Sequence, residues 1–169
     1  MYNFDPFTKV YQALLAAISG DTVMAALVQP SNIVDFTSPN PEPVKDEIES
    51  ADLPELQLIP MGGPIKRDNT MKLTVEYGFS LQITTGDNRI NGFLLPIQWA
   101  ALRAIYAAGD CLGFDWVKQV RCTAVNALQD NAAQRGIEGW VSAMHIVVTM
   151  LIDNDVLESG NEPFLRSDN

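Results

Sequence analysis

The segment that most constrains the fold is residues 70–84, where apolar and polar side chains alternate strictly. Successive side chains on a strand point to opposite faces, so this pattern predicts one long strand with an apolar face and a polar face. At about 3.3 Å per residue such a strand approaches roughly 45 Å, whereas most strands have about 5–6 residues. A strand of this length needs partners, from the same chain or from another subunit. The apolar positions are Met71, Leu73, Val75, Tyr77, Phe79, Leu81 and Ile83.

Three further segments favour strands. Residues 55–60 predict a short strand. Residues 116–128 predict a longer one, whose imperfect alternation indicates a bulge or a break. Residues 140–153 are apolar at both odd and even positions, which predicts a central strand covered on both faces.

Helical spacing of apolar residues predicts an amphipathic helix over residues 6–19, with Asp5 as its N-cap. It also predicts a short helix over residues 23–28, for which Asp21 and Thr22 offer a second cap. A further helix is expected over residues 96–108. Its predicted buried stripe consists of Leu95, Trp99, Leu102, Ile105 and Tyr106.

In this order of elements, strands come in pairs and do not alternate regularly with helices. We therefore predict an α+β fold, with a mostly antiparallel sheet of long strands and two main helices packed on it. The length of 169 residues favours one domain over residues 1–169.

The formal net charge of −10 argues against a general phosphate-binding surface. It fits either simple solubility or a passage along which nucleic acid slides without sticking. Cys111 and Cys122 have no zinc-site spacing, and two ordinary thiols indicate an intracellular protein. Neither a signal peptide nor a membrane span is expected from the sequence.

Residues 37–54 are rich in proline and carry one lysine against five acids. They predict a long exposed loop, which is either a solvated linker or an arm that orders against a neighbouring subunit or partner. Within this loop we expect Glu42, Asp46, Glu47 and Glu49 to make a subunit or partner contact. The polar tail, residues 158–169, either frays or docks on a neighbour through Phe164 and Leu165.

No arrangement of residues predicts catalysis, and we expect no enzyme activity, no cofactor and no metal site. The single histidine, His145, lies in an apolar strand and favours a hydrogen-bonded core or interface role. Ser80 and Ser142 lack a nucleophile-elbow sequence. The three tryptophans, Trp99, Trp116 and Trp140, are expected to pack in the core.

Five stretches, taken in order, resemble the tail terminator (tail completion) proteins of long-tailed bacteriophages. They are FTKVYQALLAAISGDTVMAALV, ELQLIP, KLTVEYGFSLQITTG, PIQWAALRAIYAAG and GWVSAMHIVVTMLI. The resemblance covers roughly residues 6–153 and rests on the order and character of the elements, because no invariant motif anchors it. The acidic loop and the polar tail depart from the shorter members of that family.

The resemblance implies a homo-oligomer, a hexameric ring at the end of the tail tube that stops tube polymerisation and joins the tail to the head. Its implied partners are the tail tube protein and a head connector or neck protein. DNA would pass through an acidic lumen without specific binding. The implied location is the virion, after assembly in the host bacterial cytoplasm, with no membrane involved.

Other functions remain open from the sequence. Within the same class, the chain also fits a head–tail connector or stopper subunit. A different class is a small-ligand-binding or regulatory α+β module, which requires a concave apolar pocket with convergent polar groups. A hydrolase or transferase would need clustered titratable groups in a cleft.

Overall fold

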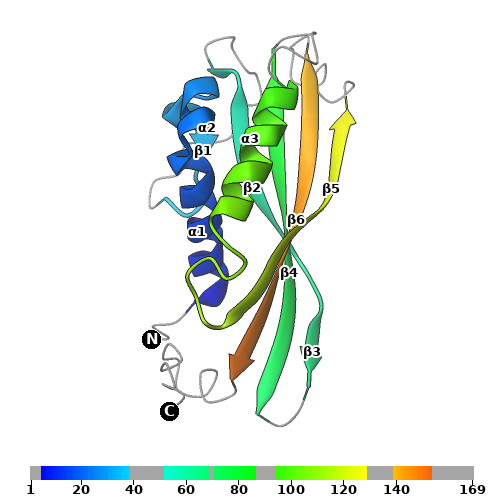
Figure 1. The fold of residues 1–169 in the computed structure, drawn as a ribbon. Coiled ribbons are helices and arrows are strands. Elements are labelled where there is room, and N and C mark those ends of the chain that lie inside the picture. The colour runs from blue at the N-terminus through cyan, green and yellow to red at the C-terminus, as the bar shows by residue number, and fades with distance from the viewer. Residues whose placement is uncertain (1–4, 39–51, 69–70, 87–93, 129–138, 154–169) are drawn as a thin grey trace.

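A computed structural model describes residues 5–38, 52–68, 71–86, 94–128 and 139–153 (Figure 1). Its helices and strands follow one another in a mixed α+β order, as the sequence predicts. The elements are α1 (Pro6–Gly20), α2 (Thr22–Leu27), the short 3-10 helix η1 (Pro30–Asn32), β1 (Ile33–Val34), β2 (Glu55–Gly62), β3 (Ile65–Arg67), β4 (Lys72–Thr85), α3 (Leu94–Ala107), β5 (Val117–Leu128) and β6 (Trp140–Asp153).

The strands form one sheet in the order β1-β2-β4-β6-β5, with β3 paired to the first part of β4. Only the β1–β2 pair is parallel, so the prediction of a mostly antiparallel sheet is confirmed. β4 and β6 pair along their full lengths, from Lys72 opposite Asp153 to Thr85 opposite Trp140. The predicted irregularity in β5 is present as two shifts of register against β6. The short strands β1 and β3 were not predicted.

The alternation in β4 sorts its side chains between the two faces of the sheet. Val75, Phe79, Leu81 and Ile83 point toward the helices and are buried. The side chains at even-numbered positions lie on the opposite face. The predicted two-faced strand is therefore present, and its ends lie within about two residues of the predicted limits.

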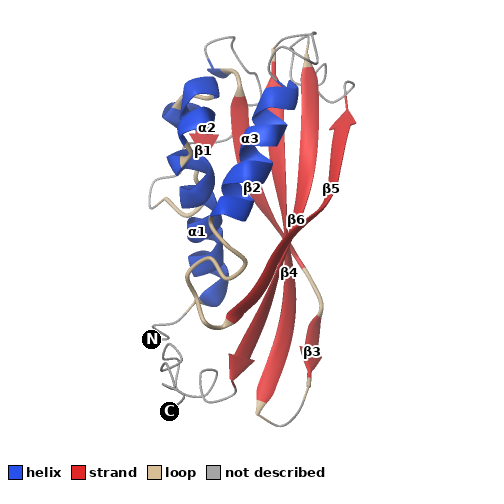
Figure 2. Cartoon of the chain, viewed as in Figure 1, coloured by secondary structure: helices blue, strands red, loops and turns tan. Residues whose placement is uncertain are grey.

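The three α-helices of the described residues lie on the same face of the sheet (Figure 2). The helix α1 begins as predicted, because Asp5 Oδ1 accepts hydrogen bonds from the backbone N–H groups of Phe7 and Thr8. Its buried residues are Val10, Tyr11, Leu14 and Ile18. Together with the helix-side residues of β2, β4, β5 and β6 they form one hydrophobic core.

The prediction that both faces of β6 are covered is wrong. Met144, Ile146, Val148 and Met150 are fully buried beneath the helices. The odd-numbered side chains lie on the other face, over which no described helix packs, and they are mostly half-buried. Since β6 lies between two long strands, neighbouring side chains shield its second face without a covering layer. Apolar composition on both faces thus reflects a central position in the sheet.

The predicted buried stripe of α3 is wrong for Leu95, Trp99 and Tyr106, whereas Ile105 is buried and Leu102 is half-buried against the core. The helix buries Leu94, Ile97 and Ile105 together with its alanines, Ala100, Ala101 and Ala104. Small side chains let the helix approach the sheet and α1 closely, which favours the alanine face inside. The larger side chains consequently point outward. Trp99 is 67% exposed, Tyr106 51% and Leu95 43%, whereas Trp116 is buried as predicted and Trp140 is half-buried.

The sheet extends past the helices as an arm formed by β3, the first part of β4 and the last part of β6 (Figure 1). Near the end of the helical layer, the rings of Phe7 in α1 and Tyr77 in β4 lie 4.7 Å apart. All three residues of β3 are exposed. The β2–β3 link comes very close to β4, where Glu76 N–H donates to the Pro64 carbonyl oxygen over 3.1 Å.

Candidate functional site

The acidic residues predicted to make a contact, Glu42, Asp46, Glu47 and Glu49, lie outside the described residues. The polar tail, residues 158–169, lies outside them as well. Both assignments therefore stay predictions. The candidate surfaces below come from the part of the chain that the structure describes.

His145 lies half-buried on the face of the sheet that no described helix covers. In the cross-strand register it stands between Ser80 of β4 and Ala124 of β5. Its backbone carbonyl oxygen accepts a hydrogen bond from Thr123 Oγ1 over 3.3 Å. The residue is thus not in the core, and its expected interface role stays a prediction.

The remaining candidate nucleophiles are Ser142, Cys111 and Cys122. Ser142 Oγ accepts from Gln98 Nε2 over 2.5 Å and donates to the Asn126 carbonyl oxygen over 2.7 Å, so it links α3, β6 and β5. Cys111 and Cys122 are both free thiols, and burial raises the pKa of Cys122, which keeps that thiol protonated at neutral pH. Among the described residues, no three His, Cys, Asp or Glu side chains are grouped to hold a metal ion.

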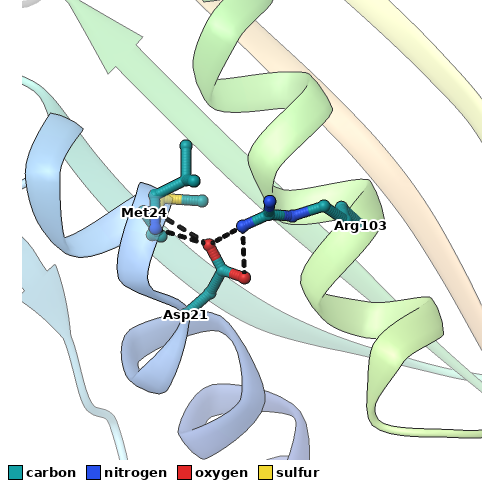
Figure 3. A network of polar contacts seen from close by, with 4 residues as sticks. Asp21, Met24 and Arg103 are labelled. Atoms are coloured by element: carbon teal, nitrogen blue, oxygen red, sulfur yellow. Dashed lines mark hydrogen bonds and ion pairs between the residues drawn. The ribbon is translucent and has the colours of Figure 1, made fainter.

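One polar network joins α3 to the junction between α1 and α2 at Asp21 (Figure 3). Asp21 Oδ1 accepts from the backbone N–H groups of Val23 and Met24, and so caps α2. Arg103 of α3 approaches the same carboxylate, with its Nη2 2.6 Å from Oδ1 and 2.7 Å from Oδ2. The Met24 N–H bond lowers the pKa of Asp21 most, partial burial opposes it, and the Arg103 guanidinium lowers the pKa further. The network fixes α3 to the α1–α2 junction.

The depressed pKa of Asp21 predicts a loss of stability in acid. Because the folded state lowers the pKa of Asp21 below its ordinary value of 3.8, the contribution to stability is present well above that pH and is lost progressively as the pH falls through and below it. Asp21→Asn keeps a capping oxygen but removes the charge. We expect the denaturant midpoints of wild type and variant to differ most near about pH 6 and to converge as the pH falls below the ordinary carboxyl pKa of 3.8. A difference that stays constant with pH would contradict this role.

A shallow hollow lies beside this network, between α1 and α3. Small side chains line it, and its one charged group, Asp21, already binds Arg103 and the start of α2. It therefore offers a ligand few convergent polar groups of the kind that specific pockets use. The lining residues are Ala16, Ala17, Gly20, Asp21, Ala104, Ala107 and Ala108.

The outward face of α3 carries an apolar stripe, which we call the α3 stripe. It consists of Leu95, Trp99, Leu102 and Tyr106, spaced four, three and four residues apart so that all lie on one side of the helix. Leu102, at the inner border of the stripe, is half-buried and packs against the core, and the other three are exposed. On the neighbouring β5, Val125 adds a side chain that is 46% exposed on the helix side of the sheet. Exposed aromatic side chains gathered in this way are typical of protein interfaces.

The sheet also has an uncovered face and an open edge. β5 is the last strand in the sheet order, and no described strand pairs with its outer side. Such an edge leaves a row of backbone N–H and C=O groups available to another chain. The uncovered face is mostly polar or small in character. Its central positions are occupied by Gly78, Ser80 and Gln82 of β4, Ala143, His145 and Val147 of β6, and Arg121 and Ala124 of β5.

The arm has a second exposed apolar patch. Ile65 is 62% exposed and Met71 63% exposed. Ile65 pairs with Val75, and Arg67 pairs with Leu73, so both lie on the helix side of the sheet. Lys66 and Lys72 are exposed on the opposite side. The tip of the arm thus combines apolar side chains with cations in a chain of strongly negative net charge.

The sequence predicts the α3 stripe inside the core because its large apolar side chains recur at helical spacing. The signal that could have corrected this is the alanine face of the same helix, whose angular position is opposite to Trp99. In the sequence, Lys66 and Arg67 form only a cationic doublet, which is too small to indicate a nucleic-acid surface. Their clustering with Ile65 requires the β3–β4 pairing.

Comparison with known proteins found no matching family model and no significant match among curated proteins. Among the described helices, none is both long enough and apolar enough to span a membrane.

Proposed function

We propose that this chain is a structural subunit of a phage virion, a tail terminator that forms a ring at the end of the tail tube. The observation that carries the proposal is the one-sided sheet, which has long strands, helices on one face, and an open edge at β5. To this the molecule adds the outward α3 stripe and the exposed arm. A subunit that remained a monomer would leave all these surfaces exposed to water.

Ring closure satisfies such surfaces physically. In a closed cyclic assembly every subunit uses the same two contacts, so no edge or apolar patch is left over at an end. A ring also matches the symmetric end of a tube while presenting a different surface on its far side. Binding to the last turn of the tube therefore stops further addition of tube subunits. The far side becomes the place where the head connector docks.

The charge of the chain fits a passage for DNA. With a net charge of −10, a ring of several copies attracts no phosphate backbone overall, so a duplex can slide through its centre without being held. Glu42, Asp46, Glu47 and Glu49 are proposed to contact a neighbouring subunit or the head connector. The tube protein and the connector are the proposed partners, and no cofactor is involved.

Removing the gene from its phage tests the function directly. If the chain terminates tails, infection without it yields tail tubes of uncontrolled length and filled heads that carry no tails. Electron microscopy of lysates would measure both outcomes, with re-supplied wild-type protein as the control. Tails of normal length that merely fail to join heads would instead assign the chain to the connector or stopper class. Normal virions would overturn both assignments.

A further inference from the structure

Resting on the ring proposed above, we propose how its subunits join: the arm of one copy packs on the α3 stripe of the next copy. The arm supplies Ile65, Arg67 and Met71. The receiving surface is the α3 stripe, centred on Trp99. The occupant of the stripe is thus a second copy of this chain, held by a head-to-tail contact.

The apolar parts of the two surfaces match in kind. Trp99 and Tyr106 present broad rings, of the type that dominates binding energy at interfaces. Ile65 and Met71 are more than half exposed and project from a narrow strand pair. A ridge of aliphatic side chains laid against an aromatic surface removes both from water.

The charges of the two surfaces also match. The C-terminal turn of α3 contains no basic residue, and its carbonyl end carries partial negative charge. Exposed Asp110 and Asp115 follow directly in the next loop. On the arm, Arg67 lies on the same side as Ile65, with Lys66 and Lys72 on the other side of the strands. Arg67 of the arm then lies next to Asp110, which follows the C-terminal end of α3. This contact orients the arm along α3.

The placement of the two surfaces makes the contact heterologous. In Figure 1 the arm projects beyond one end of the helical layer, whereas α3 lies over the main body of the sheet. Each copy therefore offers one arm and one receiving stripe, and neither is consumed when the other is used. Contacts of this type close into a ring when the rotation between neighbours divides a full turn.

Directed cross-linking tests the contact. In a Cys111→Ser background, one chain carries Met71→Cys on the arm and another carries Tyr106→Cys on the stripe, which leaves Trp99 in place. We expect a short bis-maleimide to link the mixture into dimers and to leave each variant alone unlinked. The chain with both cysteines is expected to give a ladder that ends at the ring number. The unsubstituted background, with half-buried Cys122, is the reagent control.

The matched control pairs Met71→Cys with Val23→Cys, because Val23 is a 39% exposed residue of α2 outside both surfaces. Linking no greater than in this control would overturn the proposed contact. Dimers formed by Tyr106→Cys alone would also overturn it, since they would show that stripe packs on stripe.

Substitution at the centre of the α3 stripe tests the arm–stripe contact separately from the tail terminator function. We expect Trp99→Glu to raise the concentration needed for half-assembly at least about tenfold, whereas Val23→Glu leaves it unchanged. Intact rings in the Trp99→Glu variant would overturn the arm–stripe contact but leave the tail terminator function standing. The gene-deletion phenotype decides that function independently of either variant.

Discussion

Replacing Phe79 with alanine is expected to lower the free energy of unfolding by about 3–5 kcal/mol. Phe79 is 1% exposed and lies midway along the central strand β4. Its ring centroid lies 6.4 Å from that of Tyr11 and 5.2 Å from that of Tyr77, so it joins α1 to the sheet. The alanine variant loses the transfer energy of the ring and leaves a cavity between two layers that collapse poorly.

Chemical denaturation of the purified protein would measure this loss. The control is Phe36→Ala, because Phe36 is 38% exposed and its backbone N–H, which donates to Tyr11 Oη, survives the substitution. We expect the control to lose less than about 1 kcal/mol. Similar losses in the two variants would contradict the assignment of Phe79 to the centre of the core.

Gly63→Ala is expected to detach the arm. A Cβ atom at this position would lie 1.8 Å from the Glu76 carbonyl oxygen and 3.0 Å from the Glu76 carbonyl carbon. Backbone atoms cannot yield as a flexible side chain would, so β3 must move away from β4. The variant then loses the Glu76 N–H bond to Pro64 and the three pairs of the β3–β4 ladder. We expect a loss of about 2–4 kcal/mol, limited by the free energy of releasing the arm alone.

Hydrogen exchange would locate the effect of Gly63→Ala. Fast exchange is expected at β3 and at the facing part of β4, with unchanged protection at Leu81 and Ile83 under the helices. Gly20→Ala is the matched control, because its added Cβ meets no atom within 4 Å. Protection of β3 equal to that of wild type would contradict the close packing of the β2–β3 link. Because the arm is proposed to bind the α3 stripe of the next copy, we also expect this variant to lose ring assembly while its main body stays folded.

The parts of the fold that could be predicted from the sequence are those set by local chemistry. The alternation around Val75 and Phe79 determines a strand whatever surrounds it. Asp5 before Pro6 specifies where α1 begins, and Asp21 does the same for α2. Such signals lie within a few residues of the element that they determine, so the element can be predicted from the sequence alone.

The errors concern which side of an element is covered, a property of the assembled fold. Trp99 was placed inside because it is large, yet the alanine face of α3 allows the closer approach and is buried instead. His145 was placed between two layers, but only one layer of described helices exists. β3 was missed because Ile65 and its two neighbours are too few to show a period, and they form a strand only by pairing with β4.

The candidate site was harder to predict than the fold for the same reason. Interface side chains need no fixed spacing, so Arg67 and Trp99 look ordinary in the sequence. Their significance comes from the exposure that the packing leaves them. The misplaced stripe of α3 and the unforeseen arm are therefore the two features on which the proposed subunit contact is built.

The most direct test of the central claim is the assembly state of the full chain over a wide concentration range, by native mass spectrometry with negative-stain images. The account predicts rings, expected to contain six copies, with a central hole, whose population grows with concentration. A tight twofold dimer that persists on dilution and never grows would contradict it. Such a dimer would leave the arm or the stripe unused and would favour a small-ligand-binding module.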